Sequence, residues 1–499
     1  MLNISILTMF PNIIIMLHNK GIKNISELKN GFTHTLVEPD FVQCSLKSFS
    51  FSSICSCLNP LKVKGYSIEV ILSILISLPF IGAGTVHSML GQFINKQVEA
   101  GKDVFYRLKN NPSVCWRLVL WLFAHKFLDI IRLQTSPANQ AGVKCLIFDD
   151  SVLHKTGRYI EKISRVWDHV SNRYTLGFKL LLMGYWDGTS FLPVDFSLHR
   201  EPGRNIEKPY GLKKKEIKKQ YKKKREKLSH SYERAKEADI SKIESAIKMF
   251  RQAIGRGLQI DYVLMDSWFT CEAFIDAALQ VKRQLVHLIG MYKIAKTKFV
   301  YSGQRYTYSQ IRNILGKPKR CRKLGLYYTE AIVGYNGKEV KLFFSKQGKN
   351  GKWKVFICTD KGLSFIQMIE IYQIRWTIEV FFKESKQLLG LGRCQSNDFD
   401  AHIADLTITM IQHIILTLRF RFDKYESKGG LFSEIKSEMM EQKLNQRLWG
   451  LFIEILKLIE ILFEDIDQDQ ILEKIFENDQ AYEKLSLLLN NPDNLRNVA

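Results

Sequence analysis

The spacing of apolar residues predicts helices in the first part of the chain. Apolar side chains recur at helical intervals over residues 67–78 and 114–131, and glycines and an Asn-Pro pair separate these segments. We therefore expect a helical region over residues 1–135. The apolar run over residues 70–83 contains Pro79 and is shorter than the roughly 20 residues that span a bilayer. It predicts a buried helix, and no membrane is expected as a partner.

The following residues predict an α/β sheet of mixed direction over residues 140–290. Residues 143–148 form a short apolar segment that ends in Asp149, Asp150 and Ser151, and residues 260–265 form another that ends in Asp266. Between them, an Asp-Gly turn joins two apolar segments into a hairpin. The other expected elements are the hairpin strands over residues 174–185 and 190–198, helices over 240–254 and 272–281, and a strand over 284–289.

A change of pattern after residue 290 predicts an insertion. Residues 291–360 alternate apolar and polar side chains between turn signals, which is typical of an all-β segment. A strong helical pattern over residues 365–389 follows, and we expect residues 361–425 to complete the α/β domain. Residues 426–499 predict further helices, whose apolar stripe could form a dimer or pack within the chain.

The net charge indicates a polyanionic partner. The chain has 499 residues, with 73 Lys and Arg against 50 Asp and Glu, and a net charge of +23. Nucleic acid is the commonest such partner, although a solvated lysine-rich surface gives the same balance. Residues 204–236 carry 14 basic and 4 acidic side chains (14 − 4 = +10), whereas residues 451–499 carry 4 and 11 (4 − 11 = −7). The acidic C-terminal residues are therefore not expected to hold nucleic acid.

Cysteines and histidines give no metal-ligand pattern. Only Cys55 and Cys57 are close together among the nine cysteines, so we expect reduced thiols in a cytoplasmic protein. His154, His169 and His199 also lack ligand spacing, and each is expected to be an ordinary structural histidine.

Three acids in order along the chain predict a divalent-metal site. Asp150 and Asp266 each follow an apolar strand, and Glu379 lies on the helix after the insertion. Carboxylates on rigid elements can hold the metal pair, roughly 3.5–4 Å apart, that enzymes use to cleave phosphodiesters. A single acid at the end of a strand is more often a turn or cap residue, but three such acids favour the catalytic interpretation.

The helix around Glu379 carries four functional side chains on one stripe. Tyr372, Arg375, Glu379 and Lys386 are offset by 0, 3, 7 and 14 residues, which at about 100° per residue lie within roughly 60° of one another. Glu379 would ligate a metal, while the other three would contact phosphates. The alternative is a solvated face on which Arg375 and Glu379 form an i,i+4 ion pair.

The chain resembles the DDE transposases of bacterial insertion sequences that carry a Y-R-E-K signature. The pattern Tyr-x2-Arg-x3-Glu-x6-Lys is matched without a gap by the four residues of the stripe, and Trp376 after the arginine is similar to many members. Asp149-Asp150-Ser151 resembles the family's first acidic block, which favours Asp150 and leaves Asp149 as an alternative. Residues 264–269 resemble the second block. The resemblance covers roughly residues 140–420.

The resemblance implies an RNase H-like catalytic domain that performs cut-and-paste transposition. Two divalent metal ions, Mg²⁺ or Mn²⁺, would be held by Asp150, Asp266 and Glu379, and DNA would be bound by Tyr372, Arg375, Trp376 and Lys386. The expected partners are transposon-end DNA, target DNA and a second copy of the chain in a synaptic dimer, at the nucleoid in the bacterial cytoplasm. Residues 1–135 could bind DNA ends or cap the core. Two alternatives stay open: a metal-dependent nuclease of the same fold without strand transfer, and a catalytically inactive DNA-binding protein.

Two weaker features could also contact DNA. The lysine-rich residues 213–227 could follow DNA phosphates or form a solvated charged helix. Trp353, on a basic turn of the insertion, resembles a position where family members can stack a flipped base, although an ordinary β-domain tryptophan is the simpler interpretation.

Overall fold

The computed structural model describes residues 41–61, 64–91, 100–134, 142–293, 297–348, 350–423, 425–462 and 468–490. The chain divides into two compact units. One is formed by Met1–Lys47, Ser77–Lys102 and Gly430–Ala499, and the other by Ser48–Ile76 and Asp103–Gly429. The first 40 residues, which belong to the helical region expected over residues 1–135, lie outside the described residues.

The smaller unit combines helices from both ends of the chain. The ring of Phe80 lies 5.4 Å from that of Phe41 and 5.6 Å from that of Phe432, so residues far apart in sequence share one core. Its described helices are α3 (Phe41–Ser48), α6 (Val86–Gly91), α17 (Lys428–Leu462), α18 (Gln468–Glu477) and α19 (Asp479–Asn490). The first two residues of α17 belong to the larger unit.

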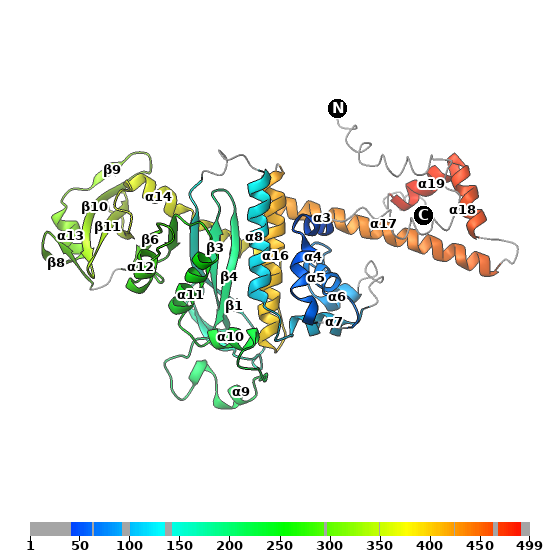
Figure 1. Ribbon diagram of the computed structural model, residues 1–499, viewed down its shortest axis with the longest axis horizontal. Helices are drawn as coiled ribbons and strands as arrows, with labels where there is room; N and C mark the ends of the chain where they lie inside the picture. The colour runs from blue at the N-terminus through cyan, green and yellow to red at the C-terminus, as the bar shows by residue number, and fades with distance from the viewer. Residues whose placement is uncertain are drawn as a thin grey trace. The chain divides into compact units, whose positions relative to one another are not determined.

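The larger unit contains the central sheet (Figure 1). Its first strands are β1 (Cys145–His154), β2 (Ser164–Asp168), β3 (Arg173–Trp186), β4 (Phe191–His199), β5 (Tyr262–Met265) and β6 (His287–Tyr292). Strands β4, β3 and β1 are antiparallel neighbours, whereas β1, β5 and β6 run parallel. The order β4-β3-β1-β5-β6, flanked by helices, confirms the expected RNase H-like sheet.

Helices cover both faces of this sheet, which explains why its inner strands are nearly continuous apolar runs. On one face, Phe148 of β1 meets Phe274 of α12 (Glu272–Leu279) at 5.1 Å, and Phe274 also contacts α11 (Lys242–Gly255). On the other face, Phe191 of β4 meets Phe381 of α15 (Trp376–Leu388) at 5.6 Å. We call these the α11 face and the α15 face.

Two long helices lie side by side next to β4 (Figure 1). They are α8 (Trp116–Gln134) and α16 (Phe399–Phe422). By length and composition α16 could cross a membrane, but 94% of its apolar window is buried within the protein, as in a core helix. The other helices of this unit are α4 (Phe51–Ser56), η1 (Asn59–Leu61), α5 (Ile68–Ser77), α7 (Lys102–Lys109), η4 (Pro209–Gly211), α9 (Lys214–Lys218) and α10 (His230–Glu237).

The insertion extends the central sheet. Its strand β12 (Lys354–Cys358) pairs with β6 of the core, so one sheet of 12 strands runs through the described part of the unit. The remaining strands are β7 (Lys298–Tyr301), β8 (Gln304–Thr307), β9 (Lys319–Cys321), β10 (Leu326–Tyr335) and β11 (Lys338–Gln347). The strand-rich insertion follows the prediction, with one short helix added, α13 (Tyr308–Ile314).

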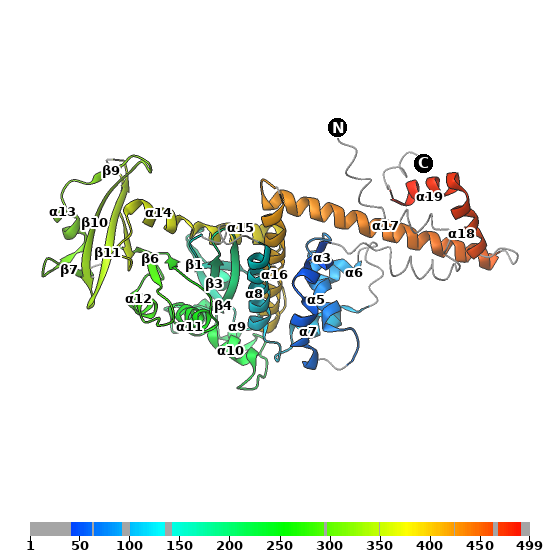
Figure 2. The same ribbon diagram turned by 45° about the horizontal axis from the view of Figure 1, so that its top comes forward.

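The helix expected over residues 365–389 is two helices, α14 (Phe365–Gln373) and α15. Figure 2 shows them one after the other. At the junction, the N–H of Arg375 donates to the carbonyl of Tyr372 (3.0 Å) and the N–H of Ile378 to that of Arg375 (3.3 Å). These i→i+3 bonds tighten the helix into a 3₁₀ turn. Tyr372 therefore lies on a different helix from Glu379 and Lys386.

Candidate active site

The parallel pairing of β1 with β5 determines the positions of the first two acids of the site. In this register Phe148 is opposite Met265, so the next residues along each strand, Asp149 and Asp266, follow side by side. Paired residues of parallel strands point to the same face of a sheet. Asp149 therefore shares a face with Asp266, and Asp150 points to the opposite face.

Side-chain contacts along β1 show which face each acid occupies. The Nζ of Lys386 on α15 donates to the hydroxyl of Ser151 at 2.7 Å, so Ser151 points to the α15 face. Phe148 points to α12 on the α11 face. Because side chains alternate along a strand, Asp149 lies with Ser151 on the α15 face and Asp150 lies with Phe148 on the α11 face.

Arg375 joins two of the acids on the α15 face. Its Nη1 donates to Asp149 Oδ2 at 3.0 Å, and its Nη2 donates to Glu379 Oε1 at 2.5 Å. Arg375 is the residue before α15 and Glu379 is in the first turn of that helix, so the i,i+4 ion pair that belonged to the alternative interpretation is present. It also reaches Asp149, which a solvated surface pair would not do.

Burial raises the pKa of Asp149 to about 7, although the charge of Arg375 opposes the shift and the charges of Asp266 and Asp150 add to it. A carboxylate that is buried beside a second acid is not fully compensated by one guanidinium. The electrostatic influence of Asp266 on Asp149 also confirms that the two acids are close. Asp149 is thus a group that gains from a further cation.

Asp150 has the opposite environment. Lys242, the first residue of α11, donates to its Oδ2, and the Nζ of Lys179 lies 3.5 Å from its Oδ1. Burial opposes ionisation, but these two ammonium groups outweigh it and hold the pKa of Asp150 below its ordinary value. Both oxygens of Asp150 already face cations on the α11 face. The sequence favoured Asp150 as the first metal ligand, whereas the structure brings Asp149 together with Asp266 and Glu379.

Tyr372 and Lys386 of the predicted stripe lie on different helices, and Trp376 lies between them in the sequence. The hydroxyl of Tyr372 donates to the carbonyl of Met265 at 3.3 Å, just before Asp266. Lys386 contacts Ser151 and the carbonyl of Val152 at the end of β1. Trp376 is 62% exposed beside Arg375. Tyr372 and Lys386 thus bind the strands that carry the acids, and only Trp376 projects into solvent.

Sequence reasoning missed the residues that compensate Asp150. Lys179 is the one charged residue in an apolar stretch of β3 and is 2% exposed. A lysine inside a buried strand needs a carboxylate partner, and this signal is present in the sequence. Lys242 also lies 4.9 Å from the ring centre of Trp268, two residues after Asp266.

The donors on the α15 face fit a divalent cation. Carboxylate oxygens are the ligands that Mg²⁺ and Mn²⁺ prefer, and Arg375 lies as a cation between two of the three acids. Within the described residues, no group of three His, Cys, Asp or Glu side chains has the spacing of a formed metal site. Asp149 and Glu379 are therefore held by the guanidinium of Arg375 rather than arranged around a preformed ion cavity.

The weaker predictions have mixed outcomes in the structure. Within residues 213–227, Lys223 and Arg225 form internal ion pairs with acids including Asp398 and Asp400, while most of the other lysines are exposed. The ring of Trp353 lies between Lys346 at 5.0 Å and Arg312 at 5.2 Å. His199 is buried, with its Nε2 2.7 Å from the Ser197 hydroxyl and its Nδ1 3.0 Å from the Ile240 carbonyl.

Comparisons with known proteins agree with this geometry. Residues 213–415 match a family model described as "Transposase DDE domain", and residues 84–303 match one described as "DDE superfamily endonuclease". The second range contains Asp149 and Asp266, and the first contains Asp266 and Glu379. A search of curated proteins gave no match. Since the two ranges together cover the RNase H-like sheet and its three acids, the chain belongs to the DDE transposase family.

Proposed function

We propose that this protein is a transposase that cleaves DNA at the ends of an insertion sequence and joins the freed strand to target DNA. The observation that supports the proposal is that Arg375 joins Asp149 to Glu379, while the register of β1 against β5 brings Asp266 next to Asp149. Phosphodiester cleavage and transfer both need such a set of carboxylates around divalent ions.

Within this proposal Asp149 takes the role that the sequence favoured for Asp150. A metal-ligating carboxylate needs free oxygen lone pairs, and those of Asp150 are directed to Lys242 and Lys179. Asp149 has one oxygen on Arg375, while its other oxygen accepts from the N–H of Asp150. A metal ion has to displace one guanidinium from Asp149, whereas at Asp150 it would have to displace two lysines.

Two Mg²⁺ or Mn²⁺ ions bound by the three acids would activate water or a 3′-hydroxyl and stabilise charge on the scissile phosphate. The chain's own residues prepare the site for that chemistry. Arg375 limits repulsion between Asp149 and Glu379, and Lys386 fixes the end of β1 through Ser151. Trp376, being exposed next to Arg375, supplies a surface for a sugar or base of the bound DNA.

The proposed partners are double-stranded DNA and a second copy of the chain. DNA is supported by the net charge of +23 and by the exposed lysines of residues 213–227. A dimer is supported by Leu451, Ile455 and Leu458 of α17, which are 46%, 47% and 57% exposed at helical spacing. Residues 1–135 and 426–499 are proposed as the regions that add end binding and dimerisation to the catalytic domain.

The experiment that tests the function is cleavage of labelled linear DNA carrying the ends of the element, with Mg²⁺ or Mn²⁺. Wild type is compared with Glu379→Gln and with the control Glu370→Gln, whose carboxylate pairs with Lys323 on the surface of α14. We expect nicking at the end followed by joining, both lost in Glu379→Gln and kept in Glu370→Gln.

Other outcomes separate the alternatives. Cleavage without joining would identify a metal-dependent nuclease that lacks strand transfer. Binding of the ends without cleavage, by well-folded wild type, would identify an inactive DNA-binding protein. Cleavage that survives Glu379→Gln would remove Glu379 from the site.

A further inference from the structure

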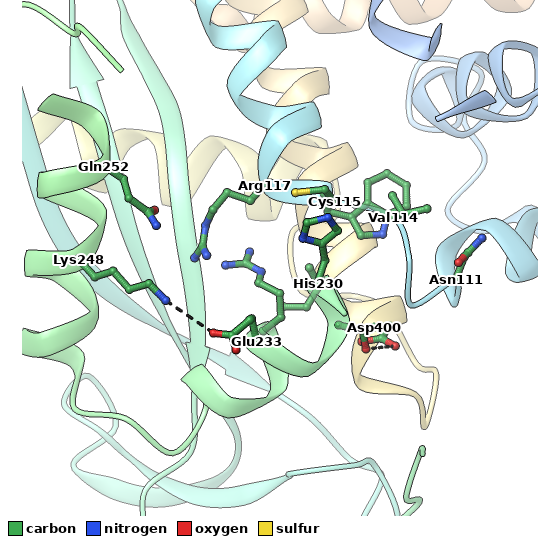
Figure 3. A pocket seen from close by; sticks show the side chains of 13 residues that line it. Asn111, Val114, Cys115, Arg117, His230, Glu233, Lys248, Gln252 and Asp400 are labelled. Carbon is green, nitrogen blue, oxygen red and sulfur yellow. Dashed lines mark hydrogen bonds and ion pairs between the residues drawn. The ribbon is translucent and has the colours of Figure 1, made fainter. Parts of the chain in front are cut away.

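A second site lies away from the three acids, in a pocket of about 220 Å³. It is formed by α8, α10, α11 and the beginning of α16. Figure 3 shows Arg117 of α8 and His230 of α10 on one side, and Lys248 and Gln252 of α11 on the other. This volume is well above what a single water molecule needs, so the pocket can hold a small ligand.

Arg234 of α10 is one of the residues that line this pocket. It is 6% exposed, and its guanidinium stacks on the ring of Phe196, 4.4 Å from the centroid. Its Nη1 donates to the carbonyl of Phe196 (2.5 Å) and to Glu237 Oε2 (3.1 Å). Its Nε and Nη2 have no hydrogen-bond partner among the described residues. These two atoms form the edge of a guanidinium that binds two oxygens of a phosphate or carboxylate at once.

Two further lining residues carry unused polar atoms. Trp116 is 4% exposed, and its Nε1 has no acceptor in the part of the chain that the structure describes. The Oε1 of Gln252 has no donor there either. Buried polar groups are nearly always paired in folded proteins. Three unpaired donor atoms and one acceptor around a single pocket therefore indicate a ligand that brings several acceptor oxygens and one hydroxyl.

The other charges around the pocket are already compensated. Arg117 is bound by Asp195 and Glu237, each at 2.7–2.8 Å. Lys248 lies 3.6 Å from Glu237 and 4.0 Å from Glu233. Asp400 accepts from Ser231 and pairs with Lys223 and Arg225. The free binding capacity is therefore concentrated on Arg234 and Trp116.

We propose that this pocket binds a small phosphate-type oxyanion, held by the Nε–Nη2 edge of Arg234 and by Nε1 of Trp116, with Gln252 accepting from a protonated oxygen. A hydrogen phosphate group has both the acceptor oxygens and the single donor that these residues require. The site uses none of the three acids, so it goes beyond the proposed transposase reaction and does not depend on it.

The electrostatics of the pocket support an anionic ligand. Burial lowers the pKa of Arg234, and the positive charge of Arg117 lowers it further. A bound anion would relieve both effects, because it would offset the desolvation of the guanidinium and screen the two arginines from each other.

The test is a calorimetric titration of the full-length protein with inorganic phosphate at constant ionic strength. EDTA is included so that phosphate cannot bind through a metal ion at the acids. Wild type is compared with Arg234→Lys and with Trp116→Phe, which removes only the Nε1 donor. The control is Arg251→Lys, an exposed arginine of α11. Circular dichroism establishes that each variant is folded.

We expect saturable binding by wild type and Arg251→Lys, and a dissociation constant raised roughly tenfold or more in Arg234→Lys and Trp116→Phe, since each loses a hydrogen bond to a charged group. If Arg234→Lys does not fold, Trp116→Phe decides alone. No binding by wild type, or equal binding by Trp116→Phe, would overturn the proposal.

A second arm identifies the source of the phosphate. The titration is repeated with the protein saturated by a short DNA duplex. Binding that persists identifies a free small oxyanion as the ligand. Loss of phosphate binding, with duplex affinity reduced by Arg234→Lys but not by Arg251→Lys, identifies a phosphate of the DNA backbone. Loss of phosphate binding without any effect of Arg234→Lys on duplex affinity would overturn the proposal.

Discussion

Asp149 and Asp150 are neighbours in sequence, but they lie on opposite faces of the central sheet and have opposite surroundings. On the α15 face, Asp149 shares one guanidinium with Glu379 and its pKa is raised to about 7, with burial the largest cause. On the α11 face, two lysines hold the pKa of Asp150 below its ordinary value. The carboxylates on the α15 face share one guanidinium, whereas the single carboxylate on the α11 face has two ammonium partners.

The two faces of β1 therefore have different proposed roles, one in binding cations and the other in packing the sheet. A face that is to bind cations cannot already contain them in fixed ion pairs, because each pair would have to be broken first. A face that packs the sheet must neutralise its buried charges within the protein. We therefore expect substitutions on the α15 face to affect activity first and those on the α11 face to affect stability first.

The change with the greatest predicted consequence is the removal of the negative charge of Asp149, compared with the same change at Asp150. Asp149→Asn is expected to lower metal-dependent cleavage by about a thousandfold, because a ligand to the metal ions supplies several kcal/mol of transition-state stabilisation. Asp150→Asn is expected to keep most of the cleavage rate per folded molecule. Cleavage rates measured under single-turnover conditions test this, and the reverse pattern would restore Asp150 as the metal ligand.

The second effect is on stability and belongs to the α11 face. Asp150→Asn is expected to lower the free energy of unfolding by roughly 3 kcal/mol, since it leaves the buried Lys179 without its carboxylate. The double variant Asp150→Asn/Lys179→Met is expected to recover part of the loss, because the unpaired charge is removed. Urea denaturation midpoints provide the measurement. A double variant less stable than the single one would contradict the assigned ion pair.

A third effect makes the same face sensitive to pH. Burial lowers the pKa of His199 to about 4, below the value of about 6.5 for an unfolded histidine. Between these values the unfolded chain binds the proton more readily, so the contribution of His199 is present above pH 6.5 and is lost as pH falls towards 4. It amounts to up to about 3 kcal/mol.

The variant His199→Gln isolates this contribution, with His154→Gln, at an exposed position, as the control. Thermal or urea unfolding is measured from pH 7 to pH 4. We expect a shallower loss of stability with acid in His199→Gln than in wild type or the control. Parallel curves for all three proteins would show that His199 does not carry the effect.

The smallest effect is expected on the α15 face, from Tyr372→Phe. The hydroxyl of Tyr372 donates a hydrogen bond of 3.3 Å to the carbonyl of Met265, and such a bond is worth about 1 kcal/mol. Cleavage is expected to fall less than about tenfold, by loosened positioning of Asp266. A loss as large as that of Asp149→Asn would mean that Tyr372 contacts the reacting groups directly.

Elements whose signals lie in neighbouring residues could be predicted from the amino-acid sequence. Most of the expected strands and helices of the α/β core are present within a few residues, because their periodicity and end signals lie in neighbouring residues. At the start of α14, for example, Ser364 and Gln367 form a capping box. The exceptions are β1, which was expected to end at residue 148 and continues through the two acids to His154, and β2, which was not expected. The spacing of Arg375 and Glu379 also allowed the ion pair between them as one of two interpretations, since an i,i+4 separation brings side chains together on a helix.

Which acid of the first block lies on the same face as Asp266 could not be predicted, because it depends on how distant strands pair in the folded chain. The choice between Asp149 and Asp150 depends on the register of β1 against β5, strands more than a hundred residues apart. A shift of one residue would exchange the faces, and nothing local to either strand fixes that register. The same reason applies to Arg234, whose unpaired edge is defined by helices that meet only in the folded chain.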